Sequence, residues 1–416
     1  MLRKILTTVL LAATATAGLC AKDIKGTVKD TEGKGIAGVV VSDGLNTVQT
    51  DAKGRFKMAA DQDSRFVFIS TPSGYVSSTL EGNTLFYKEI KDDVKKYEFV
   101  VEKNAKDDTD HNVIVIADPQ ISERSELADL AKQADDMAEF VKGMDGDYTF
   151  GICLGDIVGW DHSIYPEYNK IMATTKIDFR SAIGNHDMTN YGRSHETSMA
   201  DYEKMFGPAW YSFNVGKVHY IVLNDNYYVG RDYFYIGLID ERQLSWLEKD
   251  LSYVPKGSKV VVAMHIPTTL DKADRDAFQY GIIGDNVSNK TALYEMLEPY
   301  NTLILSGHMH TSDYEQISEN IVEMNIAGLC GAWWCGSTCI DGTPAGFKAI
   351  DMNGDEMKWI YKGCGEPENI SSTHMRTLHT LATSLQTYGT TIRNGRLNTS
   401  KTAKRHATWN SSPERT

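Results

Sequence analysis

Seven residues with metal-binding side chains lie in five short motifs spread along the chain. The motifs are Asp118-Pro119-Gln120, Gly155-Asp156, Gly184-Asn185-His186-Asp187, the single His265, and Gly307-His308-Met309-His310. They supply two carboxylates, three imidazoles and two amides, which suit divalent ions such as iron, manganese or zinc, and they lack the thiolates of a structural zinc site. The residue types therefore predict a metal centre built from Asp118, Gln120, Asp156, Asn185, His265, His308 and His310.

Each motif follows an apolar stretch that predicts a buried strand. Stretches of this kind include residues 112–117, 148–156, 260–264 and 302–305, with a further one at 218–223. Between the first two, apolar residues recur at the spacing of an amphipathic helix: Leu127, Leu130, Ala131, Ala134, Met137, Ala138 and Val141. Strand, helix, strand is an α/β unit, and ligands of open α/β sheets bind beyond the carboxyl ends of the strands. We therefore expect the motifs to converge at one edge.

The flanking regions differ in character from this α/β part. Residues 1–21 predict a signal peptide, with Arg3 and Lys4 before a short apolar run, so we expect an exported, periplasmic or extracellular protein. Cys20 leaves lipidation as an alternative, and no apolar run is long enough for a transmembrane anchor. Residues 22–103 alternate between short strands and turns, and residues 104–110 predict a linker. We interpret 22–103 as a spacer or docking domain.

The C-terminal region, residues 346–416, predicts no further domain. Its last 50 residues hold seven Lys or Arg against two Asp or Glu, and 17 of them are Ser or Thr. We expect this extension to be poorly ordered or truncated. The net charge of the whole chain is −13, which argues against a nucleic-acid partner. An acidic enzyme still binds an anionic phosphate ester if metal ions supply the positive charge.

With these motifs in this order, residues 112–345 resemble the calcineurin-like metallophosphoesterase family. Residues 22–103 are similar to the transthyretin-like or carboxypeptidase-regulatory-like β-sandwich, as in exported bacterial multidomain members. The resemblance implies a four-layer α/β sandwich preceded by a small all-β domain. It also implies two divalent ions, the first held by Asp118, Gln120, Asp156 and His310, and the second by Asp156, Asn185, His265 and His308.

The same resemblance implies a reaction. A hydroxide that bridges the two ions attacks phosphorus, and His186, steadied by Asp187, protonates the leaving oxygen of a phosphate mono- or diester. The family usually has histidine where this chain has Gln120, and an amide oxygen is a harder, weaker donor than imidazole. We therefore expect manganese, magnesium or iron rather than zinc in the first site.

Several residues have a plainer interpretation beside a functional one. His219 is expected to be structural, His162 and His195 lie in polar loops, and Asp161 is expected to cap a helix. Trp333 and Trp334 either line the substrate cleft or pack in the core. The cluster Cys330, Cys335 and Cys339 has room for one disulfide. A non-catalytic envelope protein that keeps its metal site is the alternative function, and substrate choice is expected to depend on residues 188–198 and 271–285.

Overall fold

The computed structural model describes residues 22–366, except 81, 145–146, 231–233, 270–279 and 355, together with two short strands at 390–393 and 396–399. The predicted signal peptide, most of the loop at 271–285 and most of the C-terminal tail lie outside these residues. None of the described helices is long and apolar enough to cross a membrane.

The N-terminal domain is a sandwich of two four-stranded sheets. One sheet has the order β4 (Arg55–Ala60), β1 (Lys22–Asp30), β10 (Tyr97–Lys103), β6 (Tyr75–Ser77). The other has the order β3 (Thr47–Gln49), β2 (Val40–Ser42), β5 (Phe66–Ile69), β9 (Tyr87–Glu89). Alternate side chains of β4 are buried and exposed, as expected for a strand with one face on a core. The predicted all-β sandwich is confirmed.

The second domain contains two larger sheets. The first has the order β23 (Glu356–Gly363), β22 (Gly346–Asn353), β11 (Asp110–Ile116), β12 (Tyr148–Cys153), β13 (Phe179–Ser181), β8 (Asn83–Thr84), β7 (Thr79–Leu80). The second has the order β14 (Tyr211–Val215), β15 (Val218–Val222), β18 (Lys259–Ala263), β19 (Asn301–Ser306), β21 (Ile321–Asn325), β20 (Asp313–Gln316). The hairpins β16 (Asn226–Tyr228)–β17 (Tyr235–Gly237) and β24 (Thr390–Arg393)–β25 (Arg396–Thr399) stand apart.

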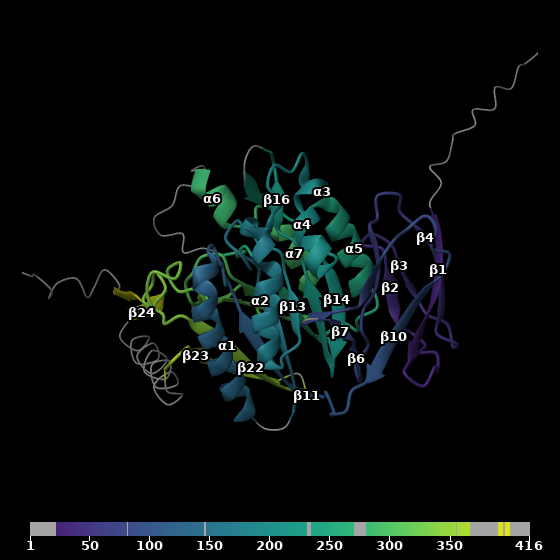
Figure 1. The fold of residues 1–416 in the computed structure, drawn as a ribbon, viewed down its shortest axis with the longest axis horizontal. Helices are drawn as coiled ribbons and strands as arrows, with labels where there is room; N and C mark the ends of the chain where they lie inside the picture. Colours follow the sequence, from purple (N-terminus) through teal and green to yellow (C-terminus); the bar gives the residue numbers. More distant parts are fainter. Residues whose placement is uncertain are drawn as a thin grey trace, which may run out of the picture.

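The two sheets pack face to face between helices. Phe150 of β12 has its ring 5.6 Å from Phe213 and 5.2 Å from Tyr220 of the second sheet. Helix α1 (Leu127–Lys142) covers the first sheet, with Phe140 against Phe347, and lies beside α2 (Tyr165–Met172), as Figure 1 shows. The remaining helices are α3 (His195–Ser198), α4 (Ala200–Phe206), α5 (Glu241–Leu251), α6 (Tyr280–Asp285) and α7 (Lys290–Leu297). The predicted four-layer sandwich is confirmed.

The N-terminal domain (purple in Figure 1) is joined to the second domain by more than the linker. Its hairpin β7–β8 extends the first sheet, with Asn83 opposite Phe179 of β13. Two ion pairs cross between the domains, Arg65 with Glu203 and Arg242 with Asp61 at 2.7 Å. Because backbone pairing fixes the orientation of a strand, this domain is docked on the second domain rather than loosely tethered to it.

The domain boundary expected at residue 345 does not coincide with a structural boundary. Strand β22 pairs antiparallel with β11 along its length, and β23 pairs with β22. A tight turn that begins at Gly354 (φ +64°) joins the two strands, with Asn353 paired to Glu356 at its base. Residues 346–363 therefore belong to the first sheet, and the expectation of a poorly ordered extension is wrong for them.

Candidate metal centre

The five motifs meet at one edge of the two sheets. Strands β11, β12 and β13 run parallel in the first sheet, and β18 and β19 run parallel in the second. Their carboxyl ends carry Asp118, Asp156, Asn185, His265 and His308 in that order. The imidazole Nδ1 of His265 lies 2.8 Å from the carbonyl oxygen of Leu154, so the motif of the second sheet touches the first.

Two glycines allow the ligand loops of β12 and β13 to touch. A methyl group added to Gly184 would lie 2.1 Å from the backbone nitrogen of Asp156, and one added to Gly155 would lie 2.6 Å from the nitrogen of Gly184. No real side chain tolerates such contacts, so the glycines of both motifs are required for the approach of Asp156 to Asn185.

The backbone at the site is strained. Five of the predicted ligands have positive φ angles, between 43° and 70°: Asp118, Gln120, Asp156, His308 and His310. A non-glycine residue in this region costs about 1–3 kcal/mol, and such residues gather at functional sites. Five such positions among the seven predicted ligands mark this edge of the sheets as a functional site.

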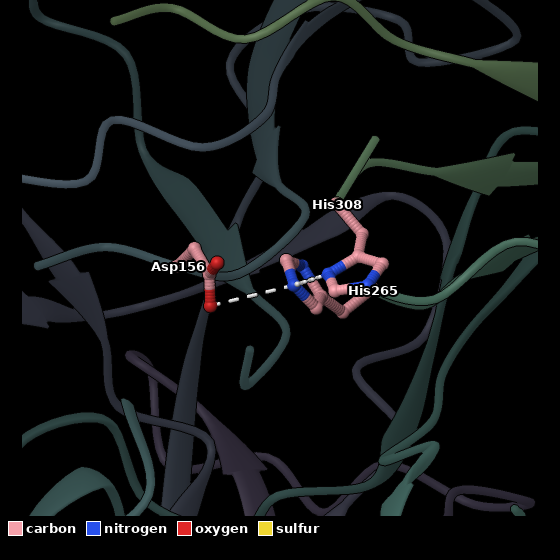
Figure 2. A group of neighbouring side chains, drawn as sticks. All are labelled: Asp156, His265 and His308. Carbon is pink, nitrogen blue, oxygen red and sulfur yellow. Dashed lines mark hydrogen bonds and ion pairs between the residues drawn. The ribbon is translucent and has the colours of Figure 1, made fainter. Parts of the chain in front are cut away.

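The donor atoms of one half of the site lie within a few ångströms of one another. His265 Nε2 is 3.3 Å from Asp156 Oδ1, 3.1 Å from Asn185 Oδ1 and 3.1 Å from His308 Nδ1. Figure 2 shows Asp156, His265 and His308 pointing toward one another, and one ligand atom from each lies within 4.8 Å of the other two. The predicted ligands of the second ion are therefore brought together.

The other half of the site is centred on Asp118. His310 Nε2 lies 3.6 Å from Asp118 Oδ1, and the backbone nitrogen of His308 donates to both Asp118 oxygens at 3.0–3.1 Å. Gln120 Nε2 lies 3.4 Å from Asp156 Oδ2. Asp156 thus lies between the two groups of ligands, as a bridging ligand must.

Hydrogen bonds outside the centre fix the tautomers of the histidines. The Nδ1–H groups of His186, His265 and His310 face the carbonyl oxygens of Gly159, Leu154 and Gly331 at 2.6–2.9 Å. A carbonyl only accepts, so Nδ1 carries a proton and Nε2 is the ring atom that faces the centre. This arrangement is how proteins orient metal-binding histidines.

His308 faces the centre through its other ring nitrogen, Nδ1. Its Nε2 lies 3.5 Å from the carboxylate of Asp285, which leaves the lone pair on Nδ1. His308 Nδ1 and His265 Nε2 therefore face each other across 3.1 Å. A proton between the two nitrogens or a metal ion bound to both satisfies this arrangement. With the oxygens of Asp156 and Asn185 beside them, the nitrogens form a donor set that fits a metal ion.

The charge of the site also favours a bound cation. Asp118 and Asp156 are buried, and in the described part of the chain neither is ion-paired with a lysine or arginine. Burial raises the pKa of Asp118. Burial alone would lower the pKa of His265, but the charge of Asp156 more than reverses this and raises it to about 10. A field of this sign favours a cation at the position that His265 Nε2 faces.

Asp187 does not have the role expected for it. Its carboxylate accepts from the backbone nitrogens of Gly184 (2.9 Å) and Ile157 (3.1 Å) and from the hydroxyl of Tyr165 (3.0 Å), whereas the ring of His186 is held by Gly159. The expectation that Asp187 steadies His186 is therefore corrected: Asp187 ties together the loops that carry Asp156 and Asn185.

Asp225 supports the site and was not among the sequence candidates. It is fully buried and accepts from the backbone nitrogens of His265 (3.3 Å) and Ile266 (2.7 Å). Burial raises the pKa of Asp225 to about 7. Its position in the sequence could have identified it, because it follows β15, the strand beside β18, at the same edge of the sheet.

Gln120 lies at the site with its amide in a specific orientation. Its nitrogen faces Asp156, and its oxygen lies 3.9 Å from Cys330 Sγ. Coordination through the oxygen of Gln120 requires its amide to be turned by half a rotation, which brings the nitrogen to Cys330.

The five described cysteines are all free, so the disulfide considered for Cys330, Cys335 and Cys339 is absent from them.

Three other residues that the sequence singled out have structural contacts. His219 is structural as expected, with Asp250 and Asn214 each 2.8 Å from its ring nitrogens. Asp161 accepts from the backbone nitrogen of Ser163, which confirms a cap. His195 is buried, and its Nε2 lies 3.2 Å from Asp240.

His162, Trp333 and Trp334 lie beside the loops that carry the ligands. His162 Nε2 donates to the carbonyl oxygen of His186 at 3.0 Å. The ring of Trp333 lies 4.9 Å from that of His310, and Trp334 Nε1 donates to the carbonyl of Pro119 at 3.0 Å. These contacts place both tryptophans beside the ligand loops.

Comparison with known proteins gives three family models that match successive parts of the chain. They are described as the N terminal of calcineurin-like phosphoesterase (residues 22–104), calcineurin-like phosphoesterase (111–312) and the C terminal of calcineurin-like phosphoesterase (323–392). Together they cover most of the chain. No curated protein matches it.

Solved structures with a related fold include enzymes. A dimetal phosphatase from Danio rerio is 15% identical with a TM-score of 0.42, and the match covers 62% of this chain and 97% of that one. A purple acid phosphatase from yellow lupin is 13% identical with a TM-score of 0.47, over 79% and 68%. These similarities are distant, and the assignment to a family rests on the three sequence models.

Proposed function

Because the chain belongs to the calcineurin-like phosphoesterase family, we propose that it hydrolyses phosphate mono- or diesters with two bound divalent ions. The observation that carries this proposal is the convergence of donor atoms from Asp156, Asn185 and His308 on Nε2 of His265, at 3.1–3.3 Å. Buried oxygen and imidazole donors gathered this closely are the ligands that a divalent ion takes in proteins.

The ligands divide into two sets that share one residue. Asp118, Gln120 and His310 would hold the first ion, Asn185, His265 and His308 the second, and Asp156 both. When bound, the ions would supply Lewis acidity, both to generate a nucleophile from water at neutral pH and to neutralise the phosphoryl oxygens. We propose manganese, magnesium or iron in the first site, because the amide of Gln120 is a hard donor.

His186 is the residue placed for proton transfer. Its Nδ1–H is held by Gly159, and its Nε2 lies 3.9 Å from Asp156 Oδ2, at the border of the centre. A protonated Nε2 at this position would give its proton to the leaving oxygen of the ester. His162, which bonds the backbone of His186, keeps the loop in place.

The test uses the full chain without its predicted signal peptide. The protein is loaded with manganese, its metal content is measured, and hydrolysis of p-nitrophenyl phosphate and bis-p-nitrophenyl phosphate is followed. Asn185→Ala serves as the blank, since it removes a ligand without adding charge. We expect two ions per chain and hydrolysis of at least one ester. Two bound ions with no hydrolysis of either ester would favour the non-catalytic alternative.

Export is a separate proposal that rests on residues 1–21. Expression of the full-length chain in a bacterial host, followed by fractionation and N-terminal sequencing, tests it. We expect a periplasmic or extracellular product that begins after one of the two small-residue sites, at Ala17 or Ala21. A cytoplasmic product with an intact N-terminus would contradict it.

A further inference from the structure

An exposed tryptophan lies against the histidine proposed to protonate the leaving group. The centroid of the Trp160 ring is 3.9 Å from that of His186, and the planes are inclined by 47°. Trp160 is 41% exposed, so part of the indole is open to solvent. The indole therefore borders both the reacting edge of the site and solvent.

The backbone around Trp160 is anchored on both sides. Gly159, the preceding residue, accepts from His186 Nδ1 at 2.6 Å, and the carbonyl of Trp160 accepts from Asn190 Nδ2 at 3.3 Å. His186 is itself tied to the centre, since its backbone nitrogen donates to Asp156 Oδ1 at 2.8 Å. The position of Trp160 relative to the ligands is thus fixed by hydrogen bonds.

A comparable contact between a histidine and an aromatic ring is buried one turn further along the chain. His162 stacks on Tyr165 with centroids 5.3 Å apart, and Tyr165 is 2% exposed. Trp160 makes a comparable contact with His186 and keeps much of its surface in solvent. Burial of apolar surface is favourable, so a molecule bound at the centre would gain affinity by covering the exposed part of the indole.

From the place of Trp160 beside the leaving-group side of the site, we propose that it is a stacking platform for the leaving group. The inference rests on the proposed function and names a substrate class: phosphoesters whose alcohol carries a planar ring, either aryl esters or nucleoside phosphates, in preference to aliphatic esters. A flat π-system recognises rings of both kinds, and stacking on it adds affinity without a specific hydrogen bond.

The kinetic test compares wild-type protein with Trp160→Ala and Trp160→Phe, at equal metal content. The substrates are phenyl phosphate, adenosine 5′-monophosphate and glycerol 3-phosphate. Tyr253→Ala is the matched control, because Tyr253 is 38% exposed and precedes β18, at the edge opposite the ligands. Dividing each variant's kcat/KM by that of wild type for the same substrate removes differences in intrinsic reactivity.

We expect Trp160→Ala to lose about tenfold in kcat/KM for the ring-bearing esters and less than twofold for glycerol 3-phosphate. Trp160→Phe should recover most of the loss, and Tyr253→Ala should change nothing. Losses with phenyl phosphate only, or with the nucleotide only, assign the class to one of the two rings. An equal loss with all three esters would overturn the proposal, since it would mean that the indole only steadies His186.

A binding measurement separates this proposal from the proposed function. Phenylphosphonate and methylphosphonate resemble monoesters but are not hydrolysed, and their Kd values are measured by calorimetry on the metal-loaded protein. We expect wild type to favour phenylphosphonate about tenfold and Trp160→Ala to lose that preference. Inactivity toward every ester with this preference intact would contradict only the proposed function. Hydrolysis without the preference would contradict only the role of Trp160.

Discussion

Replacing Asp187 by asparagine should weaken metal binding while leaving the stability of the metal-free fold almost unchanged. The carboxylate accepts from the backbones of Gly184 and Ile157 and from Tyr165. Asparagine has the same size, but its amide nitrogen is a donor and would face at least one of these donors. One or two hydrogen bonds to a charged acceptor are therefore lost, at about 1.5–3 kcal/mol each.

A second effect offsets this loss in the folding equilibrium. Burial, reinforced by the charge of Asp156, raises the pKa of Asp187 to about 6. A carboxyl whose pKa is higher in the folded chain destabilises the fold at every pH above that pKa. For a rise of roughly two units the cost at neutral pH is about 3 kcal/mol, which asparagine does not incur. Metal affinity receives no such compensation, because it depends on how Gly184 and Ile157 hold Asp156 and Asn185.

The assay is calorimetry on chelator-treated protein, first as a thermal scan and then as a manganese titration. We expect Asp187→Asn to shift Tm by no more than a few degrees and to weaken manganese binding about 10- to 100-fold, the usual effect of losing a group that supports the ligands. Tyr165→Phe, which removes only the outer hydrogen bond, should change affinity less than threefold. Wild-type metal affinity with abolished hydrolysis would refute the reasoning and return Asp187 to the chemical step.

Three further predictions concern the first metal, a buried lysine and the metal-free state. Gln120→His should raise the zinc-to-manganese ratio of the loaded protein about tenfold in a competition followed by metal analysis, because imidazole is a softer ligand; an unchanged ratio would remove Gln120 from the ligand set. Burial lowers the pKa of Lys348 from 10.5 to about 7. The side chain of Lys348 thus takes up a proton near pH 10.5 in the unfolded chain and only near pH 7 in the folded chain. The free energy by which the buried lysine destabilises the fold therefore grows as pH falls between these values, and it reaches the order of 5 kcal/mol. Lys348→Met should therefore raise Tm by several degrees at pH 7 and hardly at pH 10, while the exposed Lys358→Met should show no such trend; a gap independent of pH would contradict this. Chelator treatment should lower Tm by several degrees, and manganese should restore it, because two buried carboxylates lose their counter-charge; an unchanged Tm would show that Asp118 and Asp156 hold no metal.

The ligand set was predictable because its signals are local and its convergence follows from topology. Each motif is a polar group at the end of an apolar run, and the carboxyl ends of parallel strands meet at one edge. The role of Asp187 was not predictable in this way. Which atoms its carboxylate faces depends on the contact between Gly155 and Gly184, and a sequence does not show a contact between two loops.

Strands β22 and β23 of the first sheet have a turn signal in the sequence, but the composition of the tail that follows obscures it. Residues 346–363 contain Gly354-Asp355, a dipeptide typical of two-residue hairpins, but they directly precede the Ser- and Thr-rich residues of the tail. The extension of the first sheet by β7–β8 had no comparable signal. Two short strands, Thr79–Leu80 and Asn83–Thr84, gain their stability from the partner strand β13 rather than from their own residues.

The buried charges suggest why an acidic protein would depend wholly on metal to handle phosphate. Within the described residues no lysine or arginine is ion-paired with Asp118 or Asp156, so without metal only imidazoles oppose the charge of these buried carboxylates. Such a field repels an anion, and the net charge of −13 adds to the repulsion. Inorganic phosphate should therefore bind to the metal-loaded protein and not to the metal-free one, even though the ligand loops are held by Asp187 and Asp225 in both. Phosphate binding by calorimetry at equal ionic strength distinguishes this from a site in which protein cations hold the anion: comparable affinity without metal would show that basic side chains, and not the ions, recognise the ester.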